Sequence, residues 1–129
     1  MVYINEWLPN PFGSDAENEW VELFNAGVEP ADLRGWALVA KDGKKFSLGG
    51  KIVGGGEYLL LPRAETKLTL HNEDGSLALY DSAGSLRDEA AFLGSAPEGK
   101  SFARSNGQAS FRAGELFSWA DPTPGAANL

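Results

Sequence analysis

Acidic residues near the N-terminus are the side chains whose chemistry is most easily named. Asp15 and Glu17 lie in one expected loop, and the segments on either side of that loop carry Glu6 and Glu19. Calcium takes several carboxylate and carbonyl oxygens, so Asp15, Glu17 and Glu19 are candidate calcium ligands. The spacing lacks the Asp-x-Asp-x-Asp-Gly pattern of an EF-hand loop, and we assign no metal site. The alternative is a solvated acidic face, in which Glu22 pairs with an arginine at little energetic gain.

The chain offers little for catalysis. His71 is the single histidine, and its place before Asn72 at a turn favours a surface residue over a general base. There is no cysteine and no Gly-x-Ser-x-Gly elbow, so nucleophilic catalysis lacks its usual parts. Two carboxylates can hydrolyse a glycosidic bond, but so many acids offer pairs that none is informative. We predict that the chain is not an enzyme and assign no catalytic residue.

Aromatic residues raise the question of a glycan platform, because exposed rings can stack on sugars. At every second position of a strand, however, aromatic side chains usually fill the core. Trp119, beside Asp121–Pro122, is the best candidate for an exposed ring, although it could equally cover the end of the fold. No ligand-binding residue is assigned. The aromatic set comprises Trp7, Trp20, Trp36, Tyr58, Phe117 and Trp119.

Charge weighs against phosphate-rich partners. The net charge is −7, which opposes binding to nucleic acid and to anionic lipid. A basic cluster on an expected hairpin could touch phosphates locally, but edge strands carry such lysines to deter aggregation. The paired glycines 49–50 and 54–56 are expected to make sharp bends. The lysines of the cluster are Lys41, Lys44, Lys45 and Lys51.

Size and composition suit one domain spanning residues 1–129. The chain is 43% hydrophobic, and no apolar run approaches the roughly 20 residues that span a bilayer. The absence of cysteine excludes disulfides and thiolate metal sites. Met1 lies directly against an expected strand with no signal peptide between them. We therefore expect a domain excised from a larger protein, the alternative being a complete small cytosolic protein.

Alternating apolar residues predict short strands along the whole chain. Glu19–Asn25 is the clearest, and Glu57–Leu61 is apolar enough to be expected as a central strand. Helical turns are expected at most in Ala64–Lys67 and Arg87–Phe92. Short strands with regular turn signals predict an all-β sandwich. The other expected strands are Tyr3–Leu8, Trp36–Ala40, Lys45–Leu48, Lys51–Val53, Lys67–Leu70, Ser76–Tyr80, Ser85–Phe92, Ser101–Arg104 and Phe111–Phe117.

An ordered series of short motifs resembles the lamin-tail domain family, and in particular its bacterial type. The resemblance implies an immunoglobulin-like β-sandwich of two mostly antiparallel sheets with little or no helix. It covers nearly the whole chain, apart from a long Gly- and Ser-rich loop at Ser95–Asn106. The motifs are Ile4–Asn5–Glu6, Pro9–Asn10–Pro11, Glu19–Asn25, Asp32–Leu33–Arg34–Gly35–Trp36, Gly55–Leu61, Leu68–Asn72, Leu77–Asp81 and Thr123–Asn128.

The resemblance also implies a role. Bacterial members are accessory domains of hydrolases, nucleases or surface proteins, so we expect a binding or tethering module in an extracellular or cell-envelope parent protein. Its partner would be a protein or a cell-surface polymer. The alternatives are self-assembly through an exposed strand edge and a metal-stabilised accessory domain of a hydrolase or nuclease. Binding loops sit on a rigid scaffold, and the loops of interest are Pro9–Asn18, Pro62–Lys67 and Ala96–Asn106.

Overall fold

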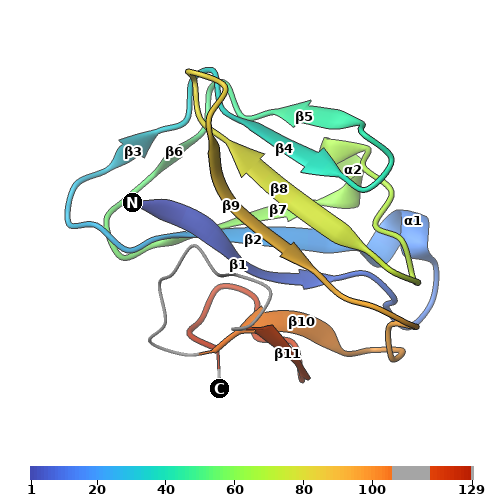
Figure 1. The fold of residues 1–129 in the computed structure, drawn as a ribbon. Coiled ribbons are helices and arrows are strands. Elements are labelled where there is room, and N and C mark those ends of the chain that lie inside the picture. The colour runs from blue at the N-terminus through green and yellow to red at the C-terminus, as the bar shows by residue number, and fades with distance from the viewer. Residues whose placement is uncertain (106–116, 129) are drawn as a thin grey trace.

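The computed structural model describes residues 1–105 and 117–128, which form a β-sandwich with a short ribbon at one side (Figure 1). The larger sheet has the order β11-β10-β1-β2-β7, and the smaller sheet has the order β5-β4-β8-β9. Strands β3 and β6 form the ribbon. The strands are β1 (Val2–Leu8), β2 (Trp20–Asn25), β3 (Ala31–Asp32), β4 (Ala37–Ala40), β5 (Lys45–Ser47), β6 (Ile52–Val53), β7 (Tyr58–Pro62), β8 (Ser76–Tyr80), β9 (Leu86–Ala91), β10 (Ser101–Arg104) and β11 (Phe117–Ala120).

All strand pairs in the described part of the chain are antiparallel, as expected for the sandwich. Strand β1 is the middle strand of the larger sheet, and a register shift between Ile4 and Glu6 lets Asn5 bulge out of the ladder. The prediction that Glu57–Leu61 is a central strand is wrong, because β7 lies at the edge of that sheet. Its apolar character arises because Leu59 and Leu61 face the core while Tyr58 packs against Phe24 on the outer face.

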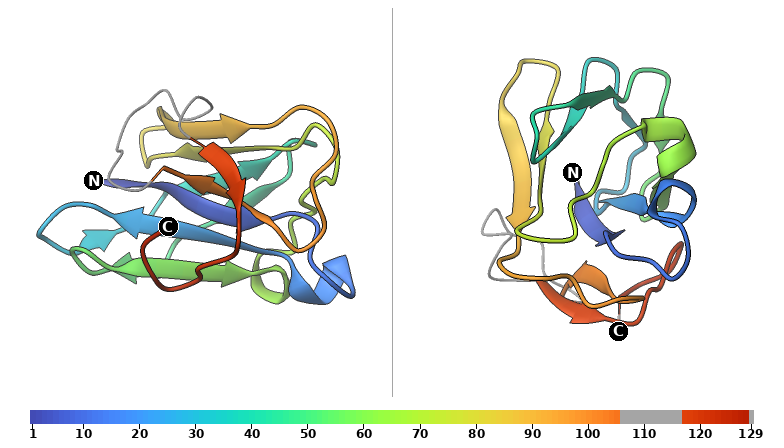
Figure 2. Two further views of the ribbon diagram at one scale, coloured as in Figure 1. Left: turned by 90° about the horizontal axis from the view of Figure 1, so that it is seen from below. Right: turned by 90° about the vertical axis from the view of Figure 1, so that its right-hand side faces the viewer.

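The core lies between the two sheets, which Figure 2 shows edge-on. Alternate residues of each strand point inward, so Ile4 and Leu23 of the larger sheet meet Leu38 and Leu79 of the smaller one, all of them fully buried. Trp7 is buried among Phe92, Phe102 and Phe117, with ring centroids 5.2–6.3 Å from its own. Stacked apolar layers of this kind hold the two sheets together.

Several local expectations need correction. Lys67–Leu70 is not a strand, although Leu68 and Leu70 are buried. Two short helices occur, α1 (Asp15–Asn18) in the expected acidic loop and α2 (Arg63–Thr66) at the first of the two expected helical turns. The second, Arg87–Phe92, lies largely in strand β9. The expected strand Ser101–Arg104 is confirmed as β10, which shortens the loop expected at Ser95–Asn106.

Part of one expected strand cannot be compared. Residues 111–116 of the predicted strand Phe111–Phe117 lie outside the described residues, and Phe117 begins β11. Within residues 1–105 and 117–128, no helix is long and apolar enough to cross a membrane.

Candidate functional site

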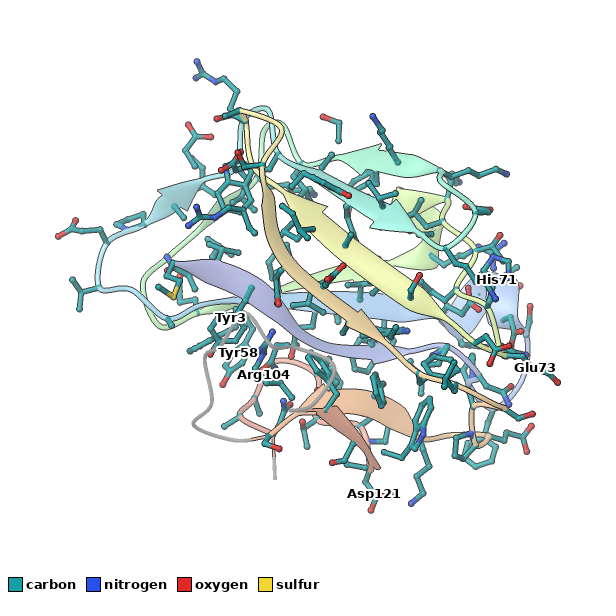
Figure 3. All side chains as sticks on the ribbon, in the orientation of Figure 1. Tyr3, Tyr58, His71, Glu73, Arg104 and Asp121 are labelled. Atoms are coloured by element: carbon teal, nitrogen blue, oxygen red, sulfur yellow. The ribbon has the colours of Figure 1, made fainter. Side chains whose placement is uncertain are left out.

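Two of the loops expected to carry binding residues, Pro9–Asn18 and Pro62–Lys67, lie at one end of the sandwich together with the first residues of the third, Ala96–Asn106. The rest of the third loop is largely strand β10, and its Asn106 lies outside the described residues. The Asn10 Nδ2 donates to the Ala96 carbonyl at 2.9 Å, and the Gly99 N–H donates to the Asn10 carbonyl at 2.8 Å. The Asn72 Nδ2 reaches the Asp15 carboxylate at 3.2 Å. We call this surface the loop end; it comprises residues 9–18, 62–67, 71–75 and 93–99. Figure 3 labels His71 and Glu73 there, beside α1.

The loop end exposes large apolar side chains within an acidic surround. Phe12 is 69% exposed and Leu93 is 91% exposed. Gly99 has a φ of +75° and lies directly under the Phe12 ring, so a Cβ there would meet the ring. The surface is thus suited to a partner that offers apolar groups and positive charge. The exposed acids around it are Glu17, Glu65, Glu73, Asp74 and Glu98.

Glu19, the residue that follows α1, is a buried charged group beside the loop end. Only 1% of it is exposed, and its Oε1 accepts hydrogen bonds from the Arg63 guanidinium at 2.8 Å and the Leu70 N–H at 3.3 Å. Its Oε2 is buried with no hydrogen-bond partner in the described structure. Burial raises the pKa of Glu19 to about 7 and outweighs the Leu70 N–H and the Arg63 guanidinium, which lower it. The carboxyl group is therefore poised to change its protonation near neutral pH.

Stability should fall as the pH rises because of Glu19. Between about pH 4.5 and pH 7 the folded chain keeps a proton that the unfolded chain has released. The free energy of unfolding therefore declines with pH in this window, by at most about 1.4 kcal/mol per pH unit, and levels off above it. Urea unfolding at intervals between pH 4 and pH 8 measures the decline.

Glu19→Gln should flatten this decline, because glutamine does not titrate. The control is Glu17→Gln on the exposed face of α1, which should keep the wild-type profile. Burial also raises the pKa of Glu22, so a shallower decline of the same sign should remain in Glu19→Gln. An unchanged profile in Glu19→Gln would contradict the assignment.

The acidic residues considered as calcium ligands do not converge. Asp15 and Glu17 lie on α1, and Glu19 is bound by Arg63, whereas Glu6 and Glu22 lie on the outer face of the larger sheet. Among the described residues, no three His, Cys, Asp or Glu side chains are grouped closely enough to hold a metal ion. Calcium binding stays an alternative to the prediction of no metal site, and a calcium titration tests it.

His71 was expected at the surface, but it is half-buried. Its Nε2 is covered by protein and has no hydrogen-bond partner in the described structure. The neighbouring Leu70 enters the core, which draws the histidine inward. A buried ring nitrogen of this kind is a polar group that a partner or a water molecule could still satisfy.

The expectation of a solvated acidic face is wrong for Glu6 and Glu22, which are fully buried. The C-terminal segment crosses the outer face of the larger sheet and covers them (Figure 2). Glu6 accepts hydrogen bonds from the Ser101 hydroxyl at 2.6 Å and the Thr123 N–H at 2.8 Å. Glu22 pairs not with an arginine but with the Asn5 Nδ2 and the Gly125 N–H. The carboxylates therefore serve as anchors for the C-terminal segment.

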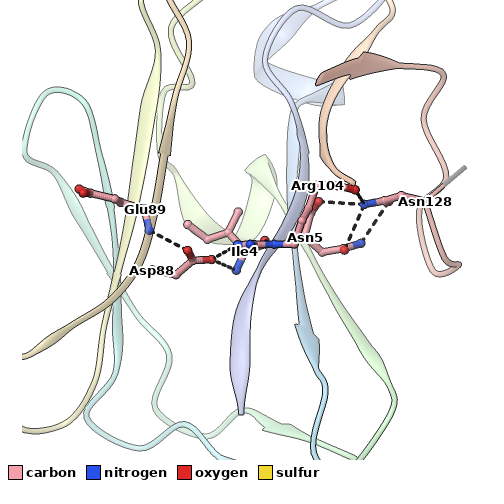
Figure 4. Close-up of polar contacts among 6 residues, drawn as sticks. All are labelled: Ile4, Asn5, Asp88, Glu89, Arg104 and Asn128. Carbon is pink, nitrogen blue, oxygen red and sulfur yellow. Dashed lines mark hydrogen bonds and ion pairs between the residues drawn. The ribbon is translucent and has the colours of Figure 1, made fainter. Parts of the chain in front are cut away.

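Asn128 completes this attachment (Figure 4). Its Nδ2 donates to the Arg104 carbonyl at 2.7 Å and to both the carbonyl and the Oδ1 of Asn5 at 3.1 Å. Its Oδ1 accepts from the Asn5 Nδ2 and the Thr123 hydroxyl at 3.2 Å. The asparagine thus joins the C-terminal segment to strands β1 and β10. We call residues 121–128 the tail.

A buried ion pair joins the two sheets. Asp88 of β9 contacts the Arg104 guanidinium of β10, and each is 1% exposed. The Asp88 carboxylate also accepts the Ile4 N–H at 2.8 Å, and the Arg104 Nε donates to the Ile4 carbonyl at 2.9 Å (Figure 4). The guanidinium carbon lies 4.4 Å from the centroid of the Tyr3 ring. Sequence reasoning missed this pair, although Asp88 shares its inward face with Ala90, which the alternation along β9 indicates.

The comparison with protein families decides the relationship of this chain. The model of the lamin tail domain matches residues 1–93, which include strands β1–β9. The chain belongs to the lamin tail domain family. This confirms the resemblance read from the motifs, and with it the immunoglobulin-like sandwich. Neither the curated proteins nor the solved structures gave a match.

In this lamin tail domain, most of the aromatic set serves the core, the exceptions being Trp20 and Tyr58. Trp119 is half-buried, and its ring lies 4.8 Å from that of Phe92 and 4.9 Å from that of Phe102. The idea of Trp119 as an exposed stacking ring is therefore wrong, and the alternative of a cover over the hydrophobic interior holds. Trp7 and Phe117 are buried in the core, while Trp20, Trp36 and Tyr58 are half-buried.

The lysine cluster divides in two. Lys41, Lys44 and Lys45 are exposed on the hairpin of β4 and β5, and β5 is an edge strand of the smaller sheet. This confirms the position in which charges deter edge pairing. Lys51 instead forms an ion pair with Glu65 of α2.

Proposed function

We propose that this lamin tail domain is a non-catalytic binding module that tethers a larger bacterial surface or secreted protein to a protein or cell-surface polymer. The observation that carries the proposal is the loop end, where hydrogen bonds join residues 9–18, 71–75 and 93–99 into one surface and helix α2 lies against α1. There Phe12 and Leu93 are exposed among acidic side chains. A preordered surface loses little conformational freedom on binding.

The chemistry of the loop end favours a protein partner with basic and apolar groups. Isolated exposed leucines are common, but two large apolar side chains on adjoining loops with an acidic surround resemble an interface core and rim. The acidity of the surface disfavours nucleic acid. Glu19 is the carboxyl group best placed to titrate near neutral pH. Its contacts are Arg63 and the Leu70 N–H, and neither forms an acid–base pair with it that would support catalysis.

Binding should be lost when the apolar side chains of the loop end become polar. The immobilised domain would be exposed to host surface proteins and cell-wall polymers, and retained material quantified for each variant. A Phe12→Ser and Leu93→Ser double variant should retain at least about ten-fold less of a specific partner than wild type.

Val28→Ser is the matched control, since Val28 is 92% exposed in the loop between β2 and β3. That loop lies at the opposite end of the sandwich from α1 and α2 (Figure 1). Equal retention by the double variant would overturn the assignment of the loop end, and turnover of a substrate by the isolated domain would overturn the non-catalytic role. A thermal-shift series with calcium, chelator and a glycan panel tests the metal and sugar alternatives in the same preparation.

A further inference from the structure

The outer face of the smaller sheet lacks charge at its centre. The outward residues of its two middle strands are small or aromatic, namely Ala37 and Val39 of β4, and Ser76, Ala78 and Tyr80 of β8. The outward face of an antiparallel sheet usually carries polar and charged side chains. Here the charges stand on the edge strands only, a distribution typical of an interface core with a charged rim.

The strand register places opposite charges at the two edges of one row. Lys45 of β5 pairs with Val39, Val39 pairs with Ala78, and Ala78 pairs with Glu89 of β9. Lys45 and Glu89 are both exposed. The row therefore runs from a positive edge across two apolar positions to a negative edge.

The face is hollowed on both sides of Val39. One hollow of about 350 Å³ extends along Ala78 toward Glu89, and another of about 410 Å³ lies between Ala37, Lys45 and Tyr80. Val39 lines both hollows. Shallow depressions beside the half-buried Tyr80 ring can accept side chains from an opposing sheet.

We propose that this face binds a second copy of the chain, sheet against sheet, about a two-fold axis that runs parallel to the strands. This axis places β5 of one copy over β9 of the other, so that Lys45 meets the partner's Glu89 twice. The perpendicular in-plane axis would instead place Lys45 against itself and Glu89 against itself, which is repulsive. The charges thus favour the axis parallel to the strands. Both copies then use the same face in the interface, which makes it isologous.

The proposal goes beyond the binding role and does not rest on it, because the loop end is a different surface. Other charges also border the face: Lys41 stands after β4, and Asp81 after β8 pairs with Arg87 of β9 at 3.8 Å. They lie at the ends of the strands, outside the central row. Packing of the small residues should leave them on the rim in contact with water.

Sedimentation equilibrium of the whole chain at about 50 mM salt, where charges are weakly screened, tests the proposal. Wild type should dimerise reversibly. Lys45→Glu and Glu89→Lys should each weaken the dimer by about ten-fold or more, since each places like charges together. The Lys45→Glu and Glu89→Lys double variant should recover the wild-type constant to within a few-fold.

Two further variants complete the design. Val39→Lys should abolish dimerisation by placing a charge in the uncharged centre of the face. Glu17→Lys is the control: it makes the same change of charge as Glu89→Lys, but at the loop end, and should leave the dimer dissociation constant unchanged. Thermal unfolding verifies that each variant is folded. A wild type that stays monomeric at the highest soluble concentration, or a double variant that fails to recover, would overturn the proposal.

Discussion

Asp88→Asn is expected to lower the free energy of unfolding by about 3–5 kcal/mol, because it removes the carboxylate that faces a buried guanidinium. Arg104 is 1% exposed and cannot turn to water without opening the junction between the sheets. Asparagine keeps the size of the side chain, so the loss reports charge and hydrogen bonding rather than a cavity. Urea unfolding at pH 7 measures it.

Asp81→Asn provides the comparison for this variant. Asp81 pairs with Arg87 at 3.8 Å on the surface, and such pairs contribute about 1 kcal/mol or less. A second comparison replaces both partners, Asp88→Leu with Arg104→Met, and should recover much of the loss because neither charge is left buried. Equal losses in Asp88→Asn and Asp81→Asn would show that the buried pair does not hold the sheets together.

Asn128→Ala should lower the free energy of unfolding by about 2–4 kcal/mol, because buried acceptors lose their donor. The carbonyls of Asn5 and Arg104 both accept from the Asn128 side chain, which is 5% exposed. Hydrogen exchange of the Thr123 and Gly125 amides should quicken as the tail opens more often. Denaturant unfolding and exchange together separate a loosened tail from a destabilised sandwich.

Asn18→Ala is the matched change on an exposed asparagine. The Asn18 Nδ2 also donates to two backbone carbonyls, those of Ser14 and Phe12, but at the surface. Water replaces such bonds, so the loss should be about 0.5 kcal/mol or less. A loss in Asn128→Ala no larger than this would mean that the buried hydrogen bonds of Asn128 contribute no more than exposed ones.

Local alternation was a sound guide to the strands of this fold. Trp20 to Asn25 alternates clearly, and its buried Val21 and Leu23 face the core as the pattern indicates. Turn chemistry was equally informative, since Asp42–Gly43 stands between β4 and β5, with Gly43 at a φ of +86°. These features depend on neighbouring residues, which the sequence displays directly.

The buried carboxylates escaped prediction because their cover comes from far along the chain. Glu6 and Glu22 occupy outward positions, which normally face water, and their partners lie 117 and 103 residues away in the tail. Alternation cannot reveal that an outward face is covered. The Thr123–Asn128 motif supported the family resemblance, but nothing in the sequence indicated that it donates hydrogen bonds to Glu6 and Glu22.

The edge position of β7 was missed for a related reason. A strand with apolar residues on both faces is usually predicted to be central. An edge strand can show the same pattern when the core covers one face and neighbours such as Phe24 cover the other. The apolar pattern along a strand indicates which of its two faces are covered, but not whether it has one neighbouring strand in the sheet or two. Strand order depends on distant pairing.

The central place of β1 bears on how this domain should be trimmed for expression. The family match ends at residue 93, whereas β1 is paired on one side by β10, which starts at Ser101. A recombinant fragment cut at the family boundary would strip that neighbour away and bare the backbone groups of β1 around Glu6 and Trp7. Bare edges of this kind recruit other molecules and precipitate. The practical unit for cloning therefore runs on through Asn128.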